Sequence, residues 1–348
     1  MAITRLAQMG FESNTTGSIN EWSGVAANAP TISNTVAKTG TYSTRFDNST
    51  TQSAYRNIAG TRQLRTSFHW YSVGPALAGD VATIYAIADA GGNLLLEIRG
   101  DENNNLLLYV AGVLQDTAVN ARVDEVFFHI GCDCKIDSVA GWVNVYADGI
   151  LILEFAGNTG NADAVAVHFG NKRAAADYWG GYQYLDDIYI DDTTGELAAA
   201  AVPDARFSYL MCETGAAEHN AWTGSDGNSV DNYALIDERP HTTDTDYILA
   251  ASADLLNTVQ LATMAIPVGM TIKAVIPTAY AKKTDGGVDT HIAMLMYGAA
   301  TLVTGADQEL PTSYLPMEER FVAKPGGGAW DQAALDALQV GVKSRGSF

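Results

Sequence analysis

Cysteine and proline are scarce in this sequence, with three cysteines and nine prolines among 348 residues. Cys132 and Cys134 lie two apart and Cys212 is distant from both, so this odd, sparse set predicts no disulfide framework. A Cys-x-Cys pair without two further ligands nearby is also no zinc motif. We therefore interpret the cysteines as inert, partly buried thiols.

Basic side chains are half as frequent as acidic ones. The chain carries 20 Lys and Arg against 40 Asp and Glu, which gives a net charge of -20. Nucleic acids and anionic membranes are normally bound through basic patches, so this excess of negative charge opposes both. We expect no nucleic acid among the partners and no insertion into a membrane.

Long apolar runs and catalytic motifs are missing as well. No stretch reaches the ~18 apolar residues of a membrane span, and residues 1–11 lack the apolar core of a signal peptide. Synthesis in a cytoplasm is therefore expected. The sequence has no phosphate-binding loop, nucleophile elbow or dinucleotide-binding glycine motif, and no two of the six histidines share metal-ligand spacing.

Glycine and short apolar runs are abundant. The chain contains 33 glycines, and runs rich in Val, Ile, Tyr, Thr and Phe end at Asn, Asp or Gly, which is typical of β-structure. Residues 142–146 and 150–155 flank Asp148 and Gly149, a pair that favours a tight hairpin turn. Similar runs occupy residues 83–87, 94–98 and 106–110. These signals predict an all-β fold of two tandem antiparallel β-sandwich (jelly-roll) domains with a short C-terminal helix.

A change in composition at residues 193–203 separates the two domains. This stretch, rich in Thr and Ala, follows two aspartates and ends at a proline. We place the first domain at residues 1–197 and the second at residues 205–348. In the second domain, strands are predicted over residues 246–251, 271–276 and 291–297.

The end of the chain has a helical pattern. Asp331 is a suitable N-cap, and Leu335, Leu338 and Val342 would share one face of a helix. Trp330, directly before the cap, would act as a packing staple. We expect this helix to dock on its own domain or on a neighbouring subunit, so that these four residues serve assembly: Trp330, Leu335, Leu338 and Val342.

Four motifs occur in order along the first domain: Gly10–Glu12, Gly40–Phe46 with the pattern G-x-Y-S-x-R-F, Val143–Gly149 and Leu185–Ile190. Together they resemble the concanavalin A-like lectin/glucanase superfamily, also called LamG-like jelly rolls. The resemblance covers about half of the chain and implies a lectin-like sandwich.

A second set of motifs lies beyond residue 205, at residues 232–238, 244–247, 281–284, 311–314 and 325–330. In this order they resemble the C-terminal region of structural proteins in tailed-bacteriophage virions. The resemblance implies a particle component made in the cytoplasm of a host bacterium. It also implies other phage capsid or tail proteins as partners. Because particle proteins match symmetric attachment points, we expect self-association, as a trimer, chiefly through residues 205–348.

Acidic residues at the end of the first domain raise the question of catalysis or metal binding. Lectin-fold glucanases carry carboxylates at positions i, i+2 and i+4 of one strand. The nearest match here is Asp187, Tyr189 and Asp191, whose middle position is aromatic, so no catalytic residue is predicted. Asp186, Asp187 and Asp191 could hold a calcium ion, but no calcium-loop motif is present. A solvated acidic cluster is the preferred interpretation, and no other cofactor is expected.

The densest aromatic stretch lies directly before these acids. Sugars stack on exposed aromatic rings, so a glycan site is one interpretation of this stretch. Packing in the sandwich core or at a subunit contact is the other, and we prefer it. The residues concerned are Tyr178, Trp179, Tyr182 and Tyr184.

These observations lead to three functional hypotheses. The first is a non-enzymatic accessory protein that decorates the head or tail of a virion, with its lectin-like domain directed outward. The second is a tail fibre or tail tip protein that binds a host surface glycan. The third is a polysaccharide hydrolase.

Overall fold

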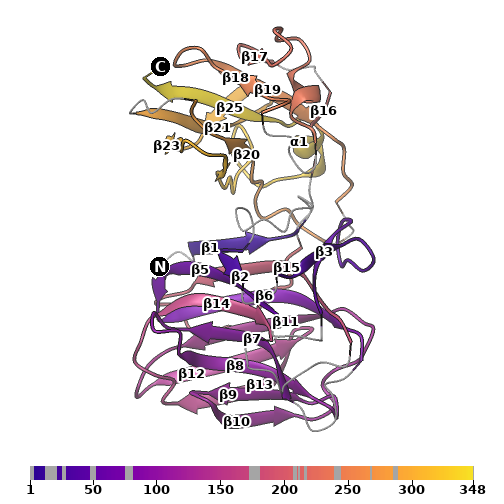
Figure 1. Cartoon of the computed structure of the whole chain (residues 1–348), viewed down its shortest axis with the longest axis vertical. Coiled ribbons are helices and arrows are strands. Elements are labelled where there is room, and N and C mark those ends of the chain that lie inside the picture. The colour runs from indigo at the N-terminus through magenta and orange to yellow at the C-terminus, as the bar shows by residue number, and fades with distance from the viewer. Residues whose placement is uncertain are drawn as a thin grey trace. The chain divides into compact units, whose positions relative to one another are not determined.

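The computed structural model describes residues 4–11, 22–25, 29–47, 52–74, 81–171, 181–206, 210, 212–214, 218–238, 244–266, 269–284 and 289–347. The chain divides into two compact units, Met1–Ser208 and Tyr209–Phe348. Strands dominate both units (Figure 1), and every pairing between strands is antiparallel in the described residues. The all-β prediction is therefore confirmed.

The first unit is a sandwich of two sheets. Sheet A has the order β13-β12-β11-β6-β15-β4-β3, with β1 beside β15. Sheet B has the order β10-β9-β8-β7-β14-β5-β2. The strands of sheet A are β1 (Thr4–Met9), β3 (Thr31–Ser33), β4 (Ser43–Phe46), β6 (Gln63–Ser72), β11 (Phe128–Lys135), β12 (Gly141–Ala147), β13 (Ile150–Gly157) and β15 (Gln183–Asp192). Those of sheet B are β2 (Gly24–Val25), β5 (Ser53–Thr61), β7 (Val81–Ala88), β8 (Leu94–Asp101), β9 (Leu106–Val110), β10 (Val113–Ala118) and β14 (Ala164–Gly170).

Side chains that alternate along each strand fill the space between the two sheets. On β6, Leu64, Phe68 and Trp70 enter the core, whereas Ser67 and His69 point to the opposite side of sheet A, called here its outer face. Rings from both sheets meet in the core, because the ring of Phe68 stacks on Tyr85 of sheet B with centroids 5.6 Å apart. Full burial of each such side chain contributes ~1.5–3 kcal/mol.

The turns and the cysteines follow the sequence prediction. Asp148 and Gly149 both have positive φ, 48° and 81°, between the paired strands β12 and β13, which confirms the predicted hairpin. The predicted runs at 83–87, 94–98 and 106–110 form the neighbouring strands β7, β8 and β9. Cys132 and Cys134 are buried in the core from strand β11, as free thiols.

The segment after β15 covers part of the outer face of sheet A. We call residues 199–206 the strap. Val202 is 2% exposed and contacts Tyr146 and Tyr189. The predicted first domain ends at 197, whereas the strap packs on the first unit, which extends to Ser208. The Ala-rich composition predicted a domain boundary here, but peptide groups of Ala199 and Pro203 in the strap have hydrogen-bond partners on the sheet.

The second unit is built around one sheet of six strands with the order β16-β19-β25-β21-β22 and β23 beside β21. Two two-stranded sheets, β17-β18 and β20-β24, accompany it. The elements are β16 (Cys212–Thr214), β17 (Thr223–Gly224), the 3-10 helix η1 (Asn232–Leu235), β18 (Ile248–Leu249), β19 (Leu256–Leu261), β20 (Thr278–Ala281), β21 (Thr290–Gly298), β22 (Thr301–Thr304), β23 (Gln308–Glu309), β24 (Leu315–Glu318), α1 (Gln332–Asp336) and β25 (Gln339–Gly346). The predicted strand at 291–297 is β21, and that at 246–251 shortens to β18.

The predicted strand at 271–276 is wrong. Only an isolated bridge between Val275 and Phe321 occurs there. The segment lies outside the six-stranded sheet, where it has no neighbouring strand with which to form a ladder. The apolar run at residues 271–276 was therefore not sufficient to form a strand.

The predicted short terminal helix begins at its predicted N-cap but ends before Leu338 and Val342, which were expected on it. Helix α1 has five residues, and the Asp331 carboxylate caps it by accepting a hydrogen bond from the Ala334 N–H at 2.8 Å. The chain then enters β25, a central strand between β19 and β21. Leu338 lies between the two elements and Val342 lies on the strand, so no helical face joins them. Backbone pairing on both sides of β25 outweighs the helical pattern.

The four residues predicted for assembly are part of the core of the second unit. Trp330, Leu335, Leu338 and Val342 are each less than 9% exposed. They pack in one cluster with Met294 and Met296 of β21. The alternative in which this segment packs on its own domain therefore describes the structure, and these side chains offer no surface for a neighbouring subunit.

Leu338 is fully buried, so its truncation tests this core. We expect Leu338→Ala to lower the free energy of unfolding by ~2–5 kcal/mol, because it leaves a cavity. Val322, which is 61% exposed, provides the control, and Val322→Ala is expected to change it by less than ~0.5 kcal/mol. Urea denaturation measures both values. Equal, small effects would contradict the burial of Leu338.

Candidate functional site

A bulge in β15 places two consecutive aspartates on the outer face of sheet A. Asp186 pairs with His69 and Tyr189 with Ser67, so two residues of β15 stand opposite Phe68 alone. Asp187 occupies the left-handed region with φ 50°. Leu185 and Ile188, on either side of the acid pair, both enter the core. Because of this extra residue, both carboxyl groups lie on the same side of the sheet.

The Asp186 carboxyl group is held by backbone N–H groups. Lys38 and Thr39 donate to its Oδ2 at 2.8 and 3.1 Å, and the N–H of Asp187 donates to its Oδ1 at 2.8 Å. Asp186 is fully buried. Burial and the adjacent Asp187 carboxyl raise its pKa to about 8, because both oppose a second negative charge at this place.

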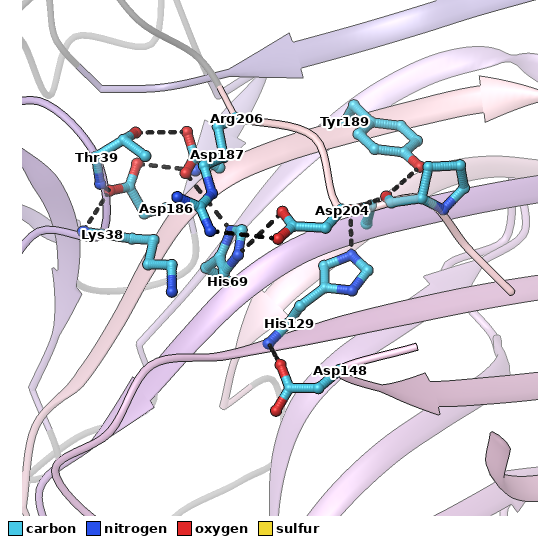
Figure 2. A network of polar contacts seen from close by, with 12 residues as sticks. Lys38, Thr39, His69, His129, Asp148, Asp186, Asp187, Tyr189, Asp204 and Arg206 are labelled. Atoms are coloured by element: carbon cyan, nitrogen blue, oxygen red, sulfur yellow. Dashed lines mark hydrogen bonds and ion pairs between the residues drawn. The ribbon is translucent and has the colours of Figure 1, made fainter. Parts of the chain in front are cut away.

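His69 lies between two carboxylates (Figure 2). Its Nδ1 is 3.5 Å from Oδ2 of Asp187, and its Nε2 is 3.2 Å from Oδ1 of Asp204 on the strap. Thr39 Oγ1 donates to the other oxygen of Asp187 at 2.7 Å. The hydrogen bond from His69 lowers the pKa of Asp204 to about 2, so this carboxylate is ionised across the neutral range.

A second histidine stands beside the first, with ring centroids 5.5 Å apart. His129 Nε2 is 2.7 Å from Ser67 Oγ, and Ser67 Oγ lies 3.4 Å from the carbonyl oxygen of Pro203 on the strap. Burial and the proximity of His69 lower the pKa of His129 to about 4. His129 is therefore neutral at pH 7 and connects Ser67 to the network through hydrogen bonding.

This arrangement does not form a glucanase site. Asp187, Tyr189 and Asp191 lie on the same face, but the middle residue is aromatic and its hydroxyl donates to the Pro203 carbonyl of the strap at 2.9 Å. Asp187 is fully buried and Asp191 is 7% exposed, so the interpretation of a solvated acidic cluster is wrong. Backbone N–H groups, the Thr39 hydroxyl and His69 take the place of water around the Asp186 and Asp187 carboxyl groups. Within the described ranges, no three His, Cys, Asp or Glu side chains are placed to hold a metal ion.

The predicted aromatic stretch is only partly described. Tyr178 and Trp179 lie outside the described residues. Tyr182 is 41% exposed, and Tyr184, with 4% exposed, packs edge-on against it at a centroid distance of 6.5 Å. Tyr184 is thus a packing residue, whereas Tyr182 belongs to the surface.

The two tyrosines belong to a larger row across sheet A. Tyr184 stands opposite Arg45 of β4 on one side and Tyr71 of β6 on the other. Tyr71 contacts Phe127 in turn, with ring centroids 5.1 Å apart. The Arg45 guanidinium lies over the Tyr182 ring at 4.6 Å. We call Arg45, Tyr71, Phe127, Tyr182 and Tyr184 the aromatic row.

In the second unit, three separate sequence motifs meet. Lys282 Nζ lies 2.6 Å from Asp244 Oδ1, and the Tyr314 hydroxyl donates to the same oxygen at 3.2 Å. The Lys282 ammonium also lies 4.5 Å from the centre of the Tyr314 ring. Next to it, the Lys283 N–H donates to the Pro311 carbonyl at 2.8 Å. Residues 244–247, 281–284 and 311–314 thus form one surface feature, called here the Lys282 cluster.

Protonation of Asp186 makes stability depend on pH. Asp186 keeps its proton up to about pH 8 in the folded chain but loses it near pH 3.8 when unfolded, so stability falls as pH rises between these values. His129, with a pKa lowered from 6.5 to about 4, opposes this fall only below pH 6.5. Between pH 6.5 and 8, we expect the free energy of unfolding to fall by up to ~1.4 kcal/mol per pH unit.

Urea unfolding at several pH values measures this slope. Asp186→Asn removes the titrating group, so we expect a reduced slope in this variant. Asp237→Asn, at an exposed position, serves as the control and keeps the slope of the natural chain. An unchanged slope in Asp186→Asn would show that another group titrates.

No family model and no curated protein matches this sequence. Solved structures with a similar fold include a sialidase, with 10% identity and a TM-score of 0.39 over 55% of this chain and 19% of the sialidase. The alginate lyase vAL-1 from Chlorella virus gives 9% identity and a TM-score of 0.42 over 54% of this chain and all of the lyase. A carbohydrate-binding module from Bacillus subtilis gives 8% identity and a TM-score of 0.32, over 48% of this chain and 95% of the module.

The match to the sialidase therefore covers about a fifth of the length of that protein. The neighbours include both enzymes and a binding module. Within the described residues, no helix has the length and apolar character needed to cross a membrane. The first unit is a sandwich of two antiparallel sheets, and no family is assigned.

Proposed function

We propose that this chain is a non-enzymatic structural component of a tailed-bacteriophage particle. In this proposal it is an accessory protein of the head or tail surface, with the lectin-like first unit directed outward and the second unit used for attachment. The observation that carries the proposal is the Lys282 cluster. Three of the stretches that resemble virion proteins, far apart in the sequence, meet there in one feature.

The first unit supports a non-enzymatic role. The acid pair Asp186 and Asp187 contacts backbone amides and Thr39, and His69 contacts Asp204 of the strap, which covers this part of the face. A glycosidase needs two carboxyl groups on either side of an accessible bond. The acid pair here is adjacent in sequence and enclosed, so it supports the fold.

Self-association as a trimer through the second unit belongs to the same proposal. The core residues Trp330, Leu335, Leu338 and Val342 cannot form that interface, because they are enclosed in their own unit. The Lys282 cluster is the better candidate for a contact, since Asp244 is 70% exposed there. Other capsid or tail proteins are the proposed partners.

Analysis of purified particles tests the proposal. We expect the chain in density-gradient particles from the cells that produce it, detected by mass spectrometry at a stoichiometric level. The double variant Asp244→Ala, Lys282→Ala removes the polar contacts of the cluster and is expected to reduce incorporation at least several-fold. Lys273→Ala, at an exposed lysine outside the cluster, is the matched control. Absence of the chain from the particles would refute the proposal.

The aromatic row favours a second candidate function, binding of a surface glycan. Tyr182 presents an exposed ring, and Tyr71 and Phe127 are half-buried beside it. Arg45 and Asp47, 3.0 Å apart, and Glu125 supply charged groups near the rings. A flat aromatic surface with polar groups at its rim is the usual chemistry for stacking on a sugar.

A glycan array with the full chain tests this second function. If a glycan binds through the row, Tyr182→Ala is expected to weaken binding roughly threefold to tenfold, because one stacked ring is lost. Tyr233→Ala in the second unit provides a control with the same change of side chain. Failure to bind any glycan, or an equal effect of the two variants, would speak against a site on the row.

A further inference from the structure

The outer face of sheet A contacts the strap mainly through the backbone of the strap. The hydroxyl groups of Tyr146 and Tyr189 donate to the carbonyl oxygens of Ala199 and Pro203. In the opposite sense, the Ala199 N–H donates to Oδ2 of Asp133 at 2.7 Å. Ser67 adds a longer contact to the Pro203 carbonyl at 3.4 Å. Main-chain groups of almost any extended peptide could make these contacts.

The donors and acceptors that contact the strap lie on adjacent strands of the sheet. Ser67, Asp133, Tyr146 and Tyr189 come from the four neighbouring strands β6, β11, β12 and β15, and each is less than 9% exposed. Arg65 fixes the Asp133 carboxylate through a hydrogen bond of 3.1 Å. Such preorganisation reduces the entropy lost when a peptide binds.

Two residues of the sheet, Gly131 and His69, contact side chains of the strap. Val202 lies directly over Gly131 of β11, where an added Cβ would come within 2.3 Å of the Val202 Cβ. Asp204 reaches the Nε2 of His69, whose Nδ1 faces Asp187 at 3.5 Å. Within the strap, Arg206 adds a longer contact to the other side of the Asp204 carboxylate at 3.6 Å. An apolar residue followed two positions later by an acid therefore matches this face.

We propose that the outer face of sheet A is a binding groove for an extended peptide in which an apolar residue precedes an acid by two positions, and that the strap occupies the groove as a built-in ligand. A partner that carries the pattern would bind by displacing residues 199–206. The glycine at 131 provides room for the apolar side chain, and His69 recognises the carboxylate. The strap stays bound in the absence of a partner because its covalent attachment gives it a high effective concentration.

The test uses the full chain with the strap released. Val202→Asp places a charge against Gly131, Tyr146 and Tyr189, so it is expected to detach the strap while leaving the sheet unchanged. Hydrogen exchange of the Ala199 amide, whose N–H donates to Asp133, should then rise to the rate of the exposed residues 197 and 198. In the natural chain this amide should remain protected, and equal exchange of the Ala199 amide in both chains would overturn the proposal.

A fluorescent peptide of residues 197–206 then measures binding by anisotropy. We expect it to bind the Val202→Asp chain and not the natural chain, whose groove is occupied. The Asp204→Asn peptide should bind roughly tenfold more weakly, because the charged hydrogen bond to His69 is lost. No binding by a released and folded chain, or equal binding of the two peptides, would overturn the proposal.

A change in the groove provides the matched control. The chain with both Gly131→Ala and Val202→Asp should not bind the natural peptide, because the new methyl group takes the place of the Val202 side chain. It should bind a peptide that carries Val202→Gly, which leaves room for that methyl group. Gly60→Ala, where an added Cβ meets only ordinary contacts, should leave binding unchanged. If Val202→Asp does not fold, Asp204→Asn is used in the chain instead, because it removes the carboxylate that contacts His69. This chain is then tested with the same peptides. Binding insensitive to Gly131 would place the peptide elsewhere and refute the groove.

Discussion

Two adjacent buried carboxyl groups impose the main electrostatic constraint on the first unit. Charge removed from water is costly, so Asp186 and Asp187 need partners or protons wherever they are enclosed. Asp186 receives three backbone N–H groups and keeps a proton, and Asp187 receives the Thr39 hydroxyl and stands beside His69. Together, these contacts join β15 to β6 and to residues 38 and 39. The same contacts orient His69 toward the strap.

On the outer face of the sandwich, the strap supplies a partner that this constraint requires. His69 could not be enclosed at 1% exposure without a second partner, and Asp204 supplies it. The Pro203 carbonyl then accepts hydrogen bonds from the hydroxyl groups of Tyr189 and Ser67, so one short segment supplies partners to several polar groups on this side of sheet A. A face that could have been open to a substrate is used to hold the chain itself.

Local signals in the sequence predicted local structure well. The turn at Asp148 and Gly149 depends only on positive φ, and strands β7, β8 and β9 depend on runs that pair with the next run along the chain. The pattern after Asp331 failed because β25 is determined by its two neighbours, β19 and β21, which lie far upstream. Leu338 and Val342 were correctly identified as apolar anchors but placed in the wrong element.

The candidate site could be predicted only in part. Asp186 and Asp187 were identified as an acidic pair, but their burial depends on Thr39, which is 148 residues away from Asp187. No motif links His69 to Asp204, since their contact requires the strap to cross the sheet. Knowledge that β6 pairs with β15 would have linked His69 to the acid pair, because that register places Asp186 opposite His69.

The buried thiols of β11 have a consequence for the redox chemistry of the chain. Cys132 and Cys134 point into the core, and the pKa of Cys132 is raised by its neighbour Cys134 and by burial. Because the thiolate is the species that reacts, the raised pKa disfavours reaction of Cys132, and the surrounding core shields both sulfurs from oxidants. Alkylation of these thiols would therefore report opening of the sandwich.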